Sequence, residues 1–215
     1  MANYNDVMPN LREPRIGGII LCGGHSRRMG SPKANLPFGP QTMLERMVEI
    51  LSGTVAPIAI VTASHLAPPR LPPEIIVAED EYAGTGPLGG LHAGLTAIVP
   101  HAEIAFATAC DAPLLKPAII TELVSRLESA DLAIPRDGEY HHPLMAIYRT
   151  ALVHKIEDLL SAGIRRPVEL LHHVTAHEVD VDLLRPVDPN LDSFRNLNTP
   201  EAYHQALLDA GLETP

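Results

Sequence analysis

The residues best suited to chemistry lie between Leu21 and Lys33, where the sequence reads LCGGHSRRMGSPK. Its paired glycines let the backbone turn sharply and direct N–H groups toward an anion, while Arg27, Arg28 and Lys33 supply positive charge. The spacing matches neither the P-loop nor the Gly-x-Gly-x-x-Gly pattern of dinucleotide binders. A flexible glycine loop with solvated arginines is the alternative. The position after an apolar strand favours an anion-binding loop, which could grip a nucleoside triphosphate.

Two aspartates also follow apolar runs. Asp111 comes after 104–110, and a carboxylate at the carboxyl end of a strand can hold Mg²⁺ together with phosphate oxygens and water. The alternative is that Asp111 caps a helix beginning at Ala112-Pro113. Asp80 lies in Glu79-Asp80-Glu81, and three acids in a row are more typical of a solvated turn.

The elements that must position these residues alternate along the chain. Strands are predicted at 16–22, 58–62, 75–78, 104–109, 132–134 and 144–148, with a short edge strand at 178–181. The first five of these runs are continuously apolar rather than alternating, as expected of strands that are buried on both faces. Helical patterns are predicted around 43–51, 86–98, 119–127, 151–160 and 199–208. This order predicts one three-layer α/β/α domain with a mostly parallel, Rossmann-like sheet and ligands at the carboxyl ends of its strands.

Length and composition limit the number of domains and the classes of partner that this chain can have. The 215 residues suit a single domain, taken as 16–211 after a flexible segment 1–15. No export signal or membrane-spanning run is evident, so a soluble, cytoplasmic protein is expected. The net charge of −10 disfavours nucleic acid or an anionic membrane as partner.

Cys22 and Cys110 are expected to be reduced and close together. The cations of the loop would lower the pKa of a nearby exposed thiol and make it reactive. The alternative is that both cysteines are buried and inert.

The sequence leaves the roles of several polar and glycine-rich segments open. The 11 histidines include the pairs 141–142 and 172–173, but no Cys or carboxylate at recognised spacing supports zinc. The 137–138 turn suggests a hairpin tip that could overhang a site. Asn196 and Asn198 would point the same way if extended, and either Asn198 or Thr199 could cap the last helix. The glycine-rich start of the 86–98 helix could admit a ligand or serve tight packing.

Taken together, the loop and six further segments resemble the molybdenum cofactor guanylyltransferases, within the nucleotidyltransferase superfamily. The six are 79–80, 86–90, 110–115, 142–144, 165–168 and 196–201, in the family's order and across nearly the whole chain. The resemblance implies Mg²⁺-dependent transfer of guanylate from GTP to the molybdopterin cofactor, with release of pyrophosphate. It also implies molybdoenzymes or their chaperones as protein partners.

The same resemblance implies roles for individual residues. Lys33, Arg28 and Asp111 would be catalytic, with Asp111 also binding the metal. The nucleotide would contact Leu21, Cys22, Gly23, Gly24, Lys33, Thr62, Asp80 and Asp111. The acceptor would contact His142, Arg165, Arg166, Asn196 and Asn198.

Three positions depart from the family pattern. Cys22 stands where Ala is common, Thr62 where Asn is frequent, and Pro32 where the guanylyltransferases usually have Asp. Because a Ser-Pro-Lys ending also occurs in cytidylyltransferases, transfer of cytidylate to this or another phosphorylated acceptor is one alternative. A nucleotide-binding partner protein without turnover is another.

Overall fold

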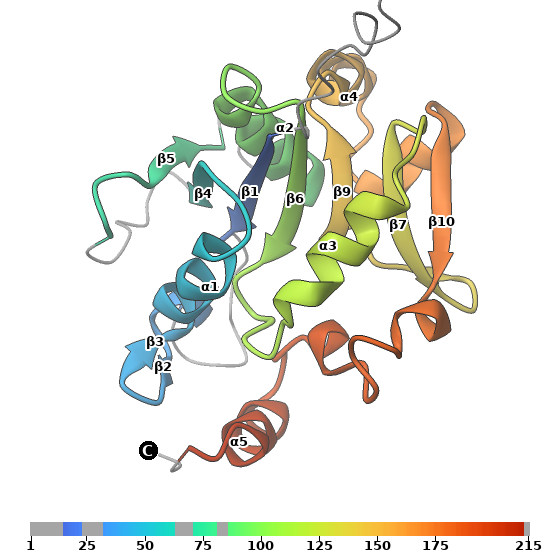
Figure 1. Cartoon of the computed structure of the whole chain (residues 1–215). Helices are drawn as coiled ribbons and strands as arrows, with labels where there is room; N and C mark the ends of the chain where they lie inside the picture. The colour runs from blue at the N-terminus through green and yellow to red at the C-terminus, as the bar shows by residue number, and fades with distance from the viewer. Residues whose placement is uncertain (1–14, 23–31, 63–70, 81–85, 213–215) are drawn as a thin grey trace, which may run out of the picture.

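The computed structural model describes residues 15–22, 32–62, 71–80 and 86–212, and places them in a sheet with helices on both faces (Figure 1). The strands are β1 (Ile16–Leu21), β2 (Pro37–Phe38), β3 (Gln41–Thr42), β4 (Ile58–Thr62), β5 (Ile76–Glu79), β6 (Ile104–Ala109), β7 (Leu132–Asp137), β8 (Tyr140–His141), β9 (Met145–Arg149) and β10 (Ala176–Asp180). The helices are α1 (Met43–Ser52), α2 (Pro87–Ile98), α3 (Pro117–Ser125), α4 (Leu152–Ser161) and α5 (Pro200–Asp209), with 3-10 turns η1 (Lys33–Asn35), η2 (Pro167–His172), η3 (Val181–Leu184) and η4 (Asp192–Phe194).

The main sheet has the order β10-β7-β9-β6-β1-β4-β5, with β8 paired to β7. Parallel pairs join β6, β1, β4 and β5 as well as β10 and β7. Strand β9 runs antiparallel to both of its neighbours, β6 and β7. The predicted mostly parallel sheet is confirmed, and the strand predicted near 178–181 is an edge strand, β10. The small β2–β3 ribbon, which the sequence analysis did not predict, forms a separate sheet.

Two apolar layers hold the helices on the sheet. Alternate residues of β1 face opposite sides, so that Ile20 packs with α1 and α3 while Ile19 packs with α2 and α4. A third, smaller cluster joins α5 to the β2–β3 ribbon through Phe38, Met43 and Leu207. Figure 1 shows α1 and α3 in front of the sheet and α5 beyond the carboxyl end of β6. The predicted three-layer domain is therefore observed.

Local signals in the sequence explain where the helices begin. Thr42 and Glu45 form a reciprocal capping box at the start of α1, and Thr199 accepts a hydrogen bond from Ala202 N before α5. Helix α2 begins at Pro87 after Gly86, whose φ of +68° suits glycine. None of the helices in the described part of the chain has the length and apolarity that crossing a membrane demands.

Candidate active site

Four neighbouring strands bring predicted site residues to one edge of the sheet. Backbone hydrogen bonds continue the ladders past the strand ends, from Cys110 N to Leu21 O (3.1 Å), from Cys22 N to Val61 O (2.8 Å), and from Asp80 N to Thr62 O (3.3 Å). Because β6, β1, β4 and β5 are adjacent and parallel, Asp111, Cys22, Thr62 and Asp80 follow one another along this carboxyl edge. In α/β sheets, ligands bind at this edge.

Lys33 joins two distant segments of the chain at that edge. Its ammonium donates to Asp111 Oδ2 at 2.6 Å and to Asn198 Oδ1 at 2.6 Å. The turn η1 that carries Lys33 is held in place because Leu36, at its end, accepts a hydrogen bond from Met43 N at the start of α1. The centre of the candidate site is therefore the Lys33 ammonium group, held between the Asp111 carboxylate and the Asn198 amide.

Asp111 is a strand-end carboxylate and does not cap a helix. Helix α3 begins only at Pro117, with Lys116 as its N-cap residue, so the capping alternative for Asp111 is wrong. The side chain is 13% exposed. Its Oδ1 is buried and has no hydrogen-bond partner among the described residues. A buried carboxylate oxygen without a partner is costly unless something binds it, and Mg²⁺ is bound in proteins by one or two such carboxylates with phosphates and water. Asp111 thus fits the expected metal.

Metal binding by a larger set of protein ligands is not supported in the described ranges. No group of three or more His, Cys, Asp or Glu side chains there could hold an ion. A single carboxylate with substrate phosphates remains the arrangement that the described residues fit.

The segment 195–198 crosses the strand-end loop that carries Asp111. Leu197 is buried, and its N–H donates to Asp111 O at 2.9 Å. Asn198 N donates to Asn196 O at 3.0 Å, which makes a three-residue turn rather than the extended run in which both amides would point the same way. Since Thr199 caps α5, the Asn198 amide is not used as a cap and bonds Lys33.

His142 lies at the same edge but on the other side of Asp111. Its carbonyl accepts from Met145 N, and Met145 pairs with Thr108 at the end of β6. The imidazole contacts Tyr140 and Phe194, with ring centroids 4.8 and 4.9 Å away. Burial lowers the pKa of His142 from its usual value, so a neutral ring is favoured near neutral pH. The hairpin predicted at 137–138 forms between β7 and β8.

The predicted arginines occupy a connection beside α2. Arg165 O accepts from Leu88 N at 3.3 Å, while the guanidinium donates to Leu160 O and Ile164 O at the end of α4. Arg166 is exposed and precedes η2. In the structure the Arg165 side chain therefore binds the carboxyl end of a helix. Among the described residues, its side-chain hydrogen bonds go to these two carbonyl groups and not to Lys33 or Asp111.

The two cysteines directly follow the neighbouring strands β1 and β6, close together as expected, and both are buried free thiols. The contact with the Cys110 thiol, followed by burial, raises the pKa of Cys22 well above its usual value. The expectation that loop cations lower this pKa is therefore wrong for Cys22, and the alternative of buried, inert thiols is the better description.

Three predicted residues, Arg28, Gly23 and Gly24, lie outside the described residues, as do Arg27 and most of the flexible segment predicted at 1–15. Leu21, by contrast, is the buried last residue of β1.

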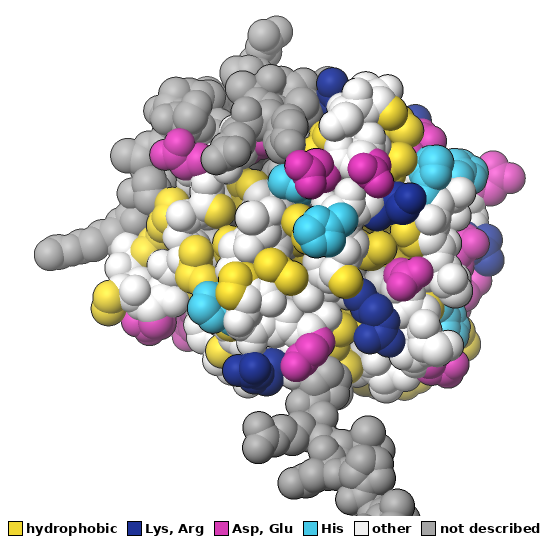
Figure 2. All heavy atoms as spheres, turned by 90° about the horizontal axis from the view of Figure 1, so that it is seen from above, with side chains coloured by type: hydrophobic (Ala, Val, Ile, Leu, Met, Phe, Trp, Pro, Cys, Tyr) yellow, Lys and Arg dark blue, Asp and Glu magenta, His cyan; other side chains and the backbone are white. Residues whose placement is uncertain are grey.

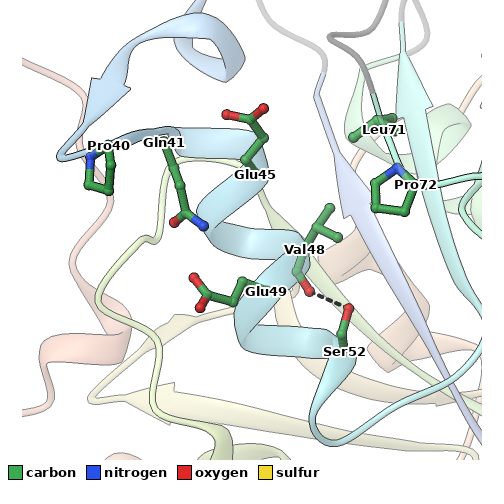
Figure 3. A pocket seen from close by; sticks show the side chains of 8 residues that line it. All are labelled: Pro40, Gln41, Glu45, Val48, Glu49, Ser52, Leu71 and Pro72. Atoms are coloured by element: carbon green, nitrogen blue, oxygen red, sulfur yellow. Dashed lines mark hydrogen bonds between the residues drawn. The ribbon is translucent and has the colours of Figure 1, made fainter.

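A pocket on the outer side of α1 contains none of the predicted site residues. It is lined by Pro40, Gln41, Glu45, Val48, Glu49, Ser52, Leu71 and Pro72 (Figure 3). Its polar groups already serve the helix, because Glu45 completes the capping box and Ser52 Oγ donates to Val48 O at 2.7 Å. We therefore place the chemistry at the carboxyl edge and not in this pocket.

Charge on the opposite end of the molecule is mixed. Figure 2 views the end away from α5, and there acidic, basic and histidine side chains alternate with apolar ones over the residues that the structure describes. Within that visible part, the basic side chains form no continuous area of the kind that a polyanion requires.

Sequence reasoning missed a buried polar cluster next to the site. Asp188 and Ser193 are fully buried, and Asp188 pairs with Lys116 Nζ at 2.6 Å. The only signal was Asp188-Pro189, which reads as an ordinary turn. Nothing in the spacing connects that turn with Lys116.

Comparison with known proteins agrees with this geometry. Residues 18–178 match the family described as MobA-like NTP transferase domain. A probable molybdenum cofactor guanylyltransferase from Mycobacterium avium is 37% identical over 91% of this chain and 96% of its own length, and one from Mycobacterium tuberculosis is 36% identical over 86% and 92%.

Among solved structures, molybdopterin-guanine dinucleotide biosynthesis protein A from Archaeoglobus fulgidus superimposes with a TM-score of 0.75 at 25% identity, covering 91% of this chain and 98% of its own. The family match spans the strand ends that carry Cys22, Thr62, Asp80 and Asp111. Since the fold, the strand-end site and the relatives agree, the chain belongs to the MobA-like NTP transferase family and is a nucleotidyltransferase.

Proposed function

We propose that this protein transfers guanylate from GTP to molybdopterin-bound molybdenum cofactor in a Mg²⁺-dependent reaction that forms molybdopterin guanine dinucleotide and releases pyrophosphate. The observation that carries the proposal is the Lys33 ammonium, held by Asp111 and Asn198 at the carboxyl edge of the sheet. The names of the curated relatives supply the substrates.

The two substrates would occupy opposite sides of Asp111. Leu21, Cys22, Thr62 and Asp80 lie on the side of β1, β4 and β5, which is the side proposed for the nucleotide. His142 lies on the side of β9, which is the side proposed for the acceptor, and Asn198 reaches Lys33 from the C-terminal segment. Such an arrangement brings the acceptor phosphate and the α-phosphate together at Lys33.

In the proposed reaction, a phosphate oxygen of the acceptor attacks the α-phosphorus of GTP. A new oxygen–phosphorus bond forms as the bond from the α-phosphorus to the bridging oxygen breaks, and that oxygen leaves with pyrophosphate. Lys33 and Arg28 stabilise the negative charge on the phosphates, and backbone N–H groups at Gly23 and Gly24 contact them. No covalent enzyme intermediate is required, since positioning and charge stabilisation suffice.

Magnesium, when bound, would neutralise phosphate charge, and Asp111 would hold it through the buried Oδ1. The remaining acceptor contacts are proposed for Arg165, Arg166 and Asn196. For Arg165 this requires the guanidinium to leave the carbonyl groups of Leu160 and Ile164, or to bind the acceptor through its remaining N–H groups.

Purified protein, GTP, Mg²⁺ and molybdopterin cofactor test the proposal directly, with dinucleotide and pyrophosphate measured in the same samples. Lys33→Ala is expected to lower kcat by about a hundredfold or more, because one preorganised donor is lost. Asp111→Asn is expected to shift the Mg²⁺ dependence strongly, and Asp80→Asn is the matched strand-end control with little shift. A larger shift for Asp80→Asn would reverse the two assignments, and absence of pyrophosphate from wild type would favour a binding protein without turnover.

Cytidylate transfer is the alternative favoured by Pro32, which directly precedes η1. Thermal unfolding with GTP or CTP, each with Mg²⁺, separates the two, since a ligand that binds only the folded state raises the melting temperature. The guanylyl proposal expects the larger increase with GTP, and a larger increase with CTP would contradict it.

A further inference from the structure

A buried ionic cluster lies behind the Lys33 site. Asp188 is the one fully buried charged residue in the described part of the chain, and its carboxylate binds Lys116 Nζ at 2.6 Å and Ser193 N at 2.8 Å. The pair with Lys116, together with the bonds from Ser193, lowers the pKa of Asp188 against the opposing effect of burial. Ser193 Oγ completes the cluster by accepting from Lys116 N at 2.9 Å.

The loop that closes this cluster is conformationally strained. Leu191 has a φ of +55°, a left-handed conformation in which the Cβ of a residue lies too close to the following carbonyl oxygen. Leu191 N donates to Asp188 O at 2.9 Å, and its side chain packs against the core under α1 and α3. Strain of this kind persists only where the surroundings fix the backbone, and it is concentrated near functional sites.

The cluster is connected to the catalytic groups through two short segments. Lys116 ends the loop that begins at Asp111, and Ser193 precedes the segment that ends at Asn198. These segments are joined at one end by Lys116 N and Ser193 Oγ, and at the other by Leu197 N and Asp111 O. Asp111 and Asn198, both bonded to Lys33 at 2.6 Å, therefore belong to two segments that are joined at both ends.

We propose that Lys116, Asp188 and Ser193 are positioning residues for nucleotidyl transfer, fixing the separation of Asp111 and Asn198 around the Lys33 ammonium. A buried ion pair is a weak source of net stability, because desolvation offsets its Coulomb attraction. The two hydrogen bonds of Ser193, from its N–H to Asp188 Oδ2 and from Lys116 N to its hydroxyl, are directional, however, and an apolar cluster of similar volume would not set the register of the two segments. This inference rests on the proposed function only for the identity of the substrates.

Ser193→Ala is the primary test because it removes one buried hydroxyl and leaves the charges intact. Thr150→Val is the matched control: Thr150 is also buried, and its Oγ1 donates to Ala102 O at the opposite edge of the sheet. Since small misplacements at a reaction centre are costly, Ser193→Ala is expected to lower kcat by about tenfold or more, with the Kd for nucleotide changed less than about twofold. Thr150→Val should retain wild-type kcat at a comparable loss of melting temperature.

Hydrogen exchange at the Leu197 amide provides a readout that needs no turnover. Exchange of this amide should quicken in Ser193→Ala and in Asp188→Asn, while amides of β4 keep their protection. If wild type makes no dinucleotide, the proposed function fails, and this exchange measurement still tests the positioning role. Wild-type kcat in Ser193→Ala, an equal loss of kcat in Thr150→Val, or unchanged exchange at Leu197 would overturn the inference.

Discussion

At the scale of single residues, the two oxygens of Asp111 have different surroundings. Oδ2 is bonded to Lys33, whereas Oδ1 is buried without a described partner. Both side chains are largely shielded, with 17% of Lys33 and 13% of Asp111 exposed, so neither charge is fully solvated. A partly buried pair of this kind contributes little net stability. The pair fixes the carboxylate through Oδ2 and leaves Oδ1 as the oxygen that would bind the proposed Mg²⁺.

The thiols permit a prediction at the same scale. Native protein should react slowly with iodoacetamide at both Cys22 and Cys110, because 8% and 6% of these residues are exposed and the pKa of Cys22 is raised. A raised pKa leaves less thiolate, which is the reactive species. Mass spectrometry of native and guanidinium-unfolded samples checks this, with full labelling expected only after unfolding. Rapid native labelling at either cysteine would contradict the assigned burial.

Site residues were predictable where they follow apolar strands. Cys22, Thr62 and Asp111 each come at the end of a buried strand, and Asp80 follows the half-exposed edge strand β5, so one topological rule collects all four. Lys116 and Asp188 could not be found in this way, because their pairing depends on how the C-terminal segment folds back onto the start of α3. The bond between Lys33 and Asn198 was missed for the same reason, although both residues were identified by the family resemblance.

At the scale of elements, α2 lies unusually close to the sheet. A Cβ added at Gly94 would stand 2.4 Å from Ile19 Cγ2, and one at Gly17 would stand 2.4 Å from Ile98 Cγ2. Ile19 and Ile98 are both fully buried, and the branched side chain of Ile19 has little freedom to move. The glycines therefore serve close helix-to-sheet packing along the middle of α2.

Gly94→Ala should thus destabilise the protein. Overpacking costs about 1–3 kcal/mol, and the 2.4 Å contact with a fully buried side chain places Gly94→Ala at about 2–3 kcal/mol within that range. Better helix propensity returns about 1 kcal/mol, which leaves a net loss of about 1–2 kcal/mol. Gly53→Ala is the control, since no atom lies within 4 Å of its Cβ position and its φ of −77° suits alanine. Urea unfolding measures both variants. Equal midpoints for the two would contradict the close packing.

The strands and helices were predicted to within a few residues because continuous apolar runs and capping residues mark them. The 58–62 and 104–109 strands were placed without error. The direction of β9 was not predictable, because a short apolar run looks the same whichever way it crosses the sheet. The β2–β3 ribbon has two residues in each strand, too few for any periodicity.

At the scale of the whole molecule, the match to the family ends at residue 178, whereas the C-terminal part reaches the carboxyl edge of the sheet at 195–198 and then forms α5. Helix α5 covers Phe38 and Leu197 in the small third cluster, and Tyr203 Oη donates to Pro37 O. Residues that follow the matched domain therefore contribute to the candidate site, since Asn198 bonds Lys33 and directly precedes the cap of α5.

Adjacent leucines in α5 test this dependence. Leu207 is fully buried in the third cluster and Leu208 is 61% exposed. Leu207→Ala should lower the free energy of unfolding by about 2 kcal/mol or more. It should also reduce the rate of nucleotidyl transfer, because the segment before α5 is held less firmly. Leu208→Ala should change neither the stability nor the rate beyond experimental error. Thermal unfolding and pyrophosphate release measure the pair, and full activity in a destabilised Leu207→Ala would show that α5 does not support Asn198.

The reversed strand β9 has a consequence for how such enzymes diversify. Because β9 opposes its neighbours, the chain entering it, 142–144, arrives at the carboxyl edge directly from a hairpin, without a helical crossover. A hairpin connection tolerates changes of length far better than a packed crossover helix does. Loops inserted here would reshape the β9 side of the site while the parallel strands β6, β1, β4 and β5 stayed untouched. One half of the edge is thus free to vary while the other is constrained by packing.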